Sequence, residues 1–122
     1  MKIERIIKAL AHENRLRISN VLYNGKFCGC ELKNILAITQ SNTSRHLNKL
    51  KQIELVVGQR DGKWIYYSLN QKFLERYKFV KQLLSKELDG EVFEKDLIRL
   101  NKYQASGSDC KDLEKDEDFF SI

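Results

Sequence analysis

The chain lacks several features that mark whole classes of protein. It has no proline, and its 122 residues contain no run of 18 apolar residues, so we expect no transmembrane helix. The first segment, MKIERIIKALAHE, is amphipathic rather than a cationic leader followed by an apolar stretch, so we expect no secretory signal. These absences predict one small cytoplasmic domain.

Cysteine is also scarce. Three cysteines without a leader predict reduced thiols in the cytosol, and an odd count argues against a disulfide scaffold. The CGC spacing of Cys28 and Cys30 differs from the CxxC of thiol oxidoreductases, and the chain has no Gly-rich phosphate loop or nucleophile elbow. The sequence therefore predicts a protein that is not an enzyme.

Charge is unevenly distributed. Residues 1–70 carry twelve Lys and Arg against five Asp and Glu, whereas residues 105–122 carry two against six. The basic N-terminal part is what contact with a phosphate backbone requires, although a merely basic soluble domain would look the same.

Apolar residues recur at helical spacing through most of the chain. Thr39 is a good N-cap for one of these helices. The predicted helices cover residues 2–11, 13–23, 30–37, about 40–52, 71–88 and 91–103.

After residue 54, the helical spacing of apolar residues gives way to segments rich in β-branched and aromatic residues. LVVGQR and KWIYYSL flank Asp61-Gly62, which is the strongest short signal for a β-hairpin. Two short helices joined by a tight turn and followed by a hairpin describe a winged helix-turn-helix. The predicted fold is mainly α with a small hairpin, in one domain of residues 1–104, followed by an acidic and flexible tail over 105–122.

The helix over residues 40–52 would carry the DNA-reading surface. Its outward stripe ends in hydroxyl, guanidinium and amide groups, which can bind base edges and phosphates. We assign base reading to Gln40, Ser41, Ser44 and Arg45, with Asn48 on the same stripe. The alternative is a solvated helix face. His46 flanks the buried stripe, and we expect it to pack, with no second histidine near it.

Backbone contacts complete this predicted surface. Asn42 and Lys49 would touch phosphates, and Arg60 and Lys63 at the hairpin tip suit a minor groove or its phosphates. Exposed hairpin cations can also serve solubility alone. The apolar stripes of residues 2–11 and 71–103 would pair in a homodimer, which would place two reading helices about one DNA turn apart on an inverted-repeat operator.

Four segments together resemble the ArsR/SmtB family of metal-responsive repressors. These are KALAHENRLRISNVL (8–22), CGCEL (28–32), QSNTSRHLNKLKQIELV (40–56) and GKWIYYSL (62–69). The resemblance implies a homodimeric winged-helix repressor that leaves its operator when a toxic ion binds, and it places a first ligand site on Cys28 and Cys30. The chain differs from the zinc sensors of the family, because its residues 71–104 contain no histidine for the second zinc site of those sensors.

The two thiols could form a switch. Residues two apart on a helix point about 200° away from each other, so Cys28 and Cys30 can share an ion only if the segment unwinds. A thiolate pair selects soft ions, and related arsenic sensors hold As(III) or Sb(III) with three thiolates.

Cys110 is the one remaining cysteine, so ligand count makes it the third candidate ligand. We expect no permanently bound cofactor. The alternatives are a repressor that responds to thiol oxidation, or one that responds to cadmium or lead.

Overall fold

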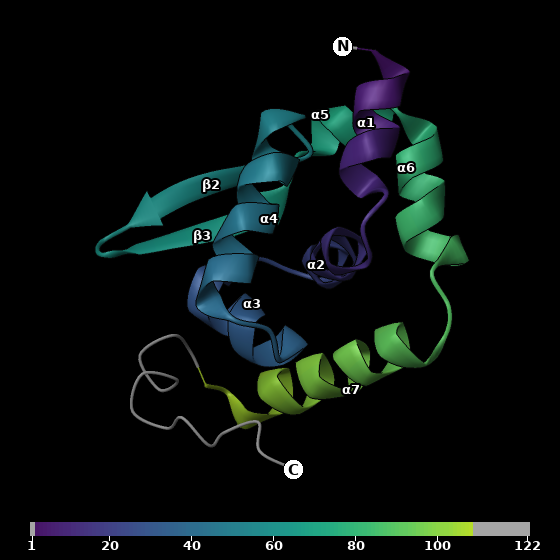
Figure 1. The fold of residues 1–122 in the computed structure, drawn as a ribbon. Helices are drawn as coiled ribbons and strands as arrows, with labels where there is room; N and C mark the ends of the chain where they lie inside the picture. Colours follow the sequence, from purple (N-terminus) through teal and green to yellow (C-terminus); the bar gives the residue numbers. More distant parts are fainter. Residues whose placement is uncertain (1, 109–122) are drawn as a thin grey trace.

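The computed structural model describes residues 2–108 (Figure 1). Helices dominate, and the hairpin projects from one side of them. The elements in chain order are α1 (Ile3–Leu10), α2 (Glu13–Tyr23), β1 (Phe27–Cys28), α3 (Gly29–Leu36), α4 (Gln40–Gln52), β2 (Val56–Asp61), β3 (Trp64–Leu69), α5 (Gln71–Arg76), α6 (Lys78–Gln82), the π-helical turn η1 (Leu83–Glu87) and α7 (Glu91–Ser106).

The helix-turn-helix of α3 and α4 is defined by local capping. Ala37 ends α3 in the left-handed conformation at φ 56°, which turns the chain sharply. Thr39 then begins α4, because its Oγ1 accepts a hydrogen bond from the Asn42 N–H at 3.2 Å. The predicted bounds and cap of α4 are thereby confirmed.

The wing contains one strand more than predicted. β2 and β3 form the expected antiparallel hairpin, and Gly62 makes its turn with φ 63°. The unexpected strand β1 pairs with β3, with Phe27 opposite Tyr67 and Cys28 opposite Tyr66. The sheet order β1-β3-β2 therefore attaches the wing to the start of α3.

α2 runs through the centre of the core. Its Ile18 and Val21 are fully buried, as are Leu32 and Ile35 of α3 and Leu50 of α4. Burying a side chain of this size contributes about 1.5–3 kcal/mol, so this apolar centre fixes how α3 and α4 sit on α2.

The single helix predicted over residues 71–88 is wrong. Tyr77 leaves the helical conformation at φ −110° and ψ 74°, where its ring packs 4.8 Å from that of Phe73. The chain thus divides into α5, α6 and η1, and α6 runs beside α1 (Figure 1). Gly90, with φ 105°, precedes α7, which crosses beneath α2 and α3.

Candidate nucleic-acid interface and thiol site

α4 lies beside the wing (Figure 1), and its outer face is polar. Thr43, His46, Leu47 and Leu50 are buried on its inner side. Arg45 Nη2 donates to Asn42 Oδ1 at 2.9 Å. The predicted DNA-contacting residues of α4 are exposed apart from half-buried Asn42, and they are Gln40, Ser41, Asn42, Ser44, Arg45, Asn48 and Lys49.

The wing tip carries the two predicted cations in exposed positions. Arg60 lies at the end of β2, and the Lys63 ammonium lies 4.9 Å from the centre of the Trp64 ring. Lys26, which the sequence did not single out, stands 5.7 Å over the Tyr66 ring and lines a shallow pocket with Arg60. Lys26 therefore adds a third cation beside the hairpin, near Arg60 and Asp61.

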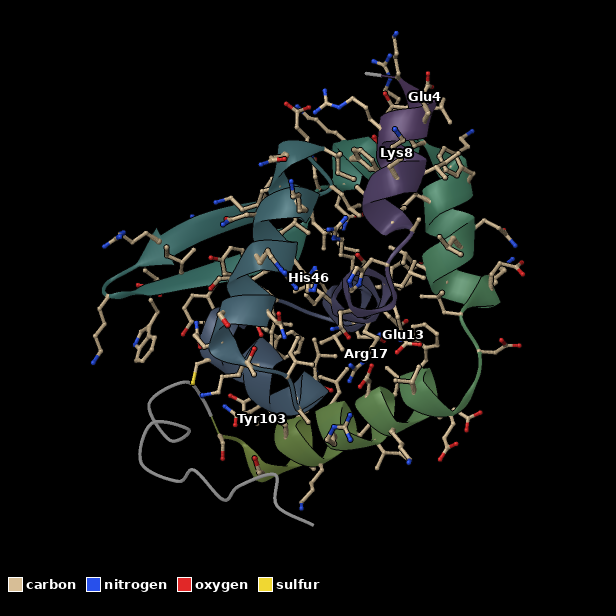
Figure 2. All side chains as sticks on the ribbon, in the orientation of Figure 1. Glu4, Lys8, Glu13, Arg17, His46 and Tyr103 are labelled. Carbon is tan, nitrogen blue, oxygen red and sulfur yellow. The ribbon has the colours of Figure 1, made fainter. Side chains whose placement is uncertain are left out.

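His46 has a histidine neighbour, contrary to the expectation from sequence. The His12 and His46 ring centres are 4.3 Å apart, and Arg15 Nε donates to His46 Nδ1 at 3.2 Å. His46 is 1 % exposed, and its Nε2 has no hydrogen-bond partner among the described residues. Burial, reinforced by the nearby charges of His12, Arg15 and Arg45, lowers the pKa of His46 to about 4. The ring is therefore neutral at pH 7 and packs α4 against the start of α2 (Figure 2).

Cys28 and Cys30 line one cavity between the wing and α4, the helix predicted to read DNA and called the reading helix below. Cys28 is 1 % exposed at the N-cap of α3, and Cys30 is half-buried in its first turn. The prediction that every cysteine is a reduced thiol is wrong for this structure, because Cys28 is disulfide-bonded. The cavity, of about 350 Å³, is also lined by Gln40 and Ser44 of α4 and by Lys63 of the wing. A soft ion held there would lie beside three of the side chains that are predicted to meet DNA, Gln40, Ser44 and Lys63.

At Gly29, the backbone between the two cysteines lies close to the start of α4. A Cβ added at Gly29 would lie 3.9 Å from the side-chain nitrogen of Gln40. The backbone between the two cysteines therefore lies beside the first residue of α4.

Glu31 is a residue of this site that the sequence analysis missed. Its Oε1 accepts a hydrogen bond from the Cys28 N–H at 2.9 Å, and its Oε2 accepts one from the Tyr103 hydroxyl. The Cys28-x-x-Glu31 spacing is that of a capping box with cysteine at the first position, and this was the signal available. Nothing local in the sequence pointed to Tyr103, 72 residues further along the chain.

A buried charge cluster holds the other end of α3. Asp96 is fully buried and binds Arg17 and Arg99, each with its Nη2 2.8 Å from Asp96 Oδ1. The hydrogen bond to Asp96 raises the pKa of Arg17. Arg17 also donates to the Leu36 carbonyl at 2.6 Å. The cluster thus ties α7 and α2 to the last turn of α3.

Cys110, the predicted third ligand, lies outside the described residues. Within residues 2–108, no three His, Cys, Asp or Glu side chains gather in a way that could hold a metal ion. The same part of the chain has no helix long and apolar enough to span a membrane.

A capped helix-turn-helix, a cationic wing and an exposed polar reading face define a winged helix-turn-helix transcriptional regulator, not an enzyme. The family of bacterial regulatory proteins of the arsR type matches residues 12–57. The arsenical resistance operon repressor of Bacillus subtilis is 41 % identical over 88 residues, covering 71 % of this chain and 78 % of that protein. The chain belongs to the ArsR family.

Other relatives agree on the family and differ in the named ion. A Staphylococcus aureus homologue of the cadmium resistance regulatory protein CadC is 33 % identical over 87 residues, covering 70 % of this chain and 67 % of that protein. The homodimeric winged helix-turn-helix DNA-binding domain from Mycobacterium bovis has a TM-score of 0.60 and 25 % identity, over 71 % of this chain and 82 % of that one. The regulator HlyU of Vibrio vulnificus has a TM-score of 0.55 and 31 % identity, over 65 % and 83 %.

Proposed function

We propose that this protein is a homodimeric repressor that releases an inverted-repeat operator when As(III) or Sb(III) binds its cysteine thiolates. The observation that carries the proposal is the cavity shared by Cys28, Cys30, Gln40, Ser44 and Lys63. The proposed soft-ion ligands and the proposed DNA-facing side chains line the same walls, which supports a coupling between ion binding and DNA binding.

In the bound state, α4 enters the major groove and the wing lies on the adjacent backbone. Gln40, Ser41, Ser44, Arg45 and Asn48 face the base edges. Arg45 is the main base-reading residue, because a bidentate arginine–guanine contact discriminates by about 1–3 kcal/mol. Asn42, Lys49, Arg60 and Lys63 take phosphates, which fix the position of the protein but carry no sequence information.

Ion binding breaks this arrangement at the start of α3. Cys28 stands outside the helix with extended backbone, whereas Cys30 belongs to the first turn. Drawing both sulfurs onto one soft ion unwinds that turn, and Gly29 transmits the movement to Gln40. Cys110 is proposed as the third thiolate. The disulfide bond that Cys28 forms in the structure must be reduced before an ion can bind, as a reducing cytosol would ensure.

The test is a titration of the protein bound to the DNA upstream of its own gene. Arsenite, antimonite, cadmium and peroxide are added separately to fully reduced protein, and release is followed by fluorescence anisotropy. We expect arsenite and antimonite to release the DNA. We also expect Cys28→Ser and Cys30→Ser to bind DNA as the wild type does but to resist release.

Matched variants locate the remaining parts of the site. Cys110→Ser should need more arsenite, and a full response from this variant would remove Cys110 as a ligand. Arg45→Ala should lose specific DNA binding without any change in its thiol chemistry. Release by peroxide alone would overturn the metalloid proposal in favour of a redox sensor.

Cadmium is the second candidate effector, because several relatives are named cadmium resistance regulators. Cadmium usually takes four ligands, as zinc does. Release by cadmium at lower concentration than arsenite would therefore select this candidate and would require a fourth ligand besides the three cysteines.

A further inference from the structure

α7 lies beyond the segment that matches the family and yet contacts the proposed sensor helix at both ends. The family match ends at residue 57, whereas α7 covers Glu91–Ser106. Figure 2 labels Tyr103 on α7 and Arg17 on α2, where these helices meet α3. The contacts are polar, buried and specific, so they do more than cover apolar surface.

At the first turn of α3 the contact runs through Glu31. The Tyr103 hydroxyl, in a side chain 2 % exposed, donates to Glu31 Oε2. Glu31 Oε1 in turn accepts from the Cys28 N–H at 2.9 Å. Tyr103 therefore holds the carboxylate in the position that caps the helix at the first cysteine of the pair.

At the last turn of α3 the contact runs through two arginines. Arg99 Nε donates to the Ile35 carbonyl at 2.5 Å, and Arg17 Nη2 donates to the Leu36 carbonyl at 2.6 Å. The buried carboxylate of Asp96 orients both guanidinium groups. Cations at a helix C-terminus satisfy its free carbonyls and favour its dipole.

We propose that α7 is a clamp that holds α3 in its helical, DNA-competent form, and that Tyr103 is the positioning residue that sets how readily the Cys28–Cys30 turn opens. Opening that turn separates the Cys28 N–H from the Glu31 carboxylate. The hydrogen bond from Tyr103 holds this carboxylate in its capping position, and it therefore opposes the opening. The role of Tyr103 in setting the threshold, the effector concentration that releases DNA, rests on the proposed function. Its role in keeping the Cys28–Cys30 turn closed does not.

The closing role is tested without any effector. Cys28 is disulfide-bonded in the structure, so the protein is first fully reduced. It is then treated with iodoacetamide, and the alkylation rate of Cys28 is followed by mass spectrometry, because this 1 % exposed sulfur at the N-cap of α3 is reached when the turn opens. Tyr103→Phe and Glu31→Gln should each accelerate it about three- to tenfold, since a hydrogen bond to a charged group is lost or weakened. Tyr77→Phe, which removes a hydroxyl far from α3, should leave the rate unchanged.

Urea unfolding of the same variants separates local from global opening. An acceleration no larger than the change in the global unfolding constant would overturn the positioning role, as would a Tyr103→Phe rate equal to that of the wild type. Arsenite titration of the DNA complex then tests the threshold, and Tyr103→Phe should release DNA at about three- to tenfold lower arsenite.

The two proposals fail in different ways. Faster alkylation of Cys28 in a protein that arsenite does not release from DNA would leave the clamp intact and overturn the proposed function. Release of wild type and Tyr103→Phe at the same arsenite concentration would leave the proposed function intact and overturn the threshold.

Discussion

His46 shows how one buried side chain on the reading helix depends on proton concentration. Its pKa of about 4 lies below the ordinary value of 6.5 because burial, and then the nearby His12, Arg15 and Arg45, disfavour the charged ring. The unfolded chain binds a proton more readily than the folded one. This contribution to stability is therefore complete above pH 6.5 and is lost as the pH falls from 6.5 toward 4.

We expect His46 to account for about 3 kcal/mol of lost unfolding free energy across that pH range. The pKa itself is measured by NMR titration of the two histidine rings. The unfolding free energy is measured in urea at pH 7 and pH 4, with His46→Gln as the control that cannot titrate. An NMR pKa near 6.5 for His46, or an equal pH loss in His46→Gln, would contradict this account.

The faces of the reading helix were predictable residue by residue, whereas its neighbours were not. A period of 3.6 separates buried Thr43, Leu47 and Leu50 from exposed Ser41 and Arg45 by arithmetic alone. The contact between His12 and His46 joins residues 34 positions apart, and only the packing of α2 on α4 creates it. Local periodicity contains no information of that kind.

At the scale of elements, a buried charge cluster attaches α7 to α2 and α3. Removal of one charge from this cluster should destabilise the fold. Asp96 is fully buried between Arg17 and Arg99, so its neutralisation leaves two guanidinium groups short of a counter-charge. Asp96→Asn should destabilise the protein by about 3–5 kcal/mol, as measured by urea unfolding.

Glu91→Gln is the matched control on the same helix. Glu91 pairs with Lys95 at 2.9 Å on the solvent side of α7, and such pairs contribute little. Its urea midpoint should equal that of the wild type. A similar loss in both variants would mean that general charge on α7, rather than the buried cluster, governs stability.

Elements with a local signal were predicted, and the others were not. Thr39 marked the start of α4, and Asp61-Gly62 marked the hairpin. β1 has two residues, too few for any alternation to show, and its pairing with β3 is a tertiary event. The break at Tyr77 has no Pro or Gly to mark it, so local sequence signals do not predict it.

At the scale of the whole molecule, an apolar groove lies between α1 and α6. Ile7 is 52 % exposed on one wall, Phe79 is 43 % exposed on the other, and Leu83 continues the surface. The solved Mycobacterium bovis domain of similar fold is a homodimer. In the homodimer proposed above, a second copy would cover this groove, as the predicted pairing of the terminal stripes requires.

Ile7→Glu should convert the protein to a monomer and weaken operator binding at least about tenfold, because one reading helix alone contacts half of the site. Sedimentation equilibrium measures the oligomeric state, and anisotropy measures the DNA affinity. Tyr23→Glu is the control, because Tyr23 is 37 % exposed at the end of α2, outside both terminal stripes, and does not line the groove. Dissociation of both variants, or of neither, would contradict the assignment of this surface.

The short strand β1 gives both DNA-gripping parts a common point of attachment. Cys28 pairs with Tyr66 of the wing on one side and begins α3 on the other. A displacement of Cys28 would therefore move both the hairpin and the start of the helix-turn-helix. Under the proposed function, an ion bound at Cys28 would therefore displace both DNA-contacting parts of a protomer in one step.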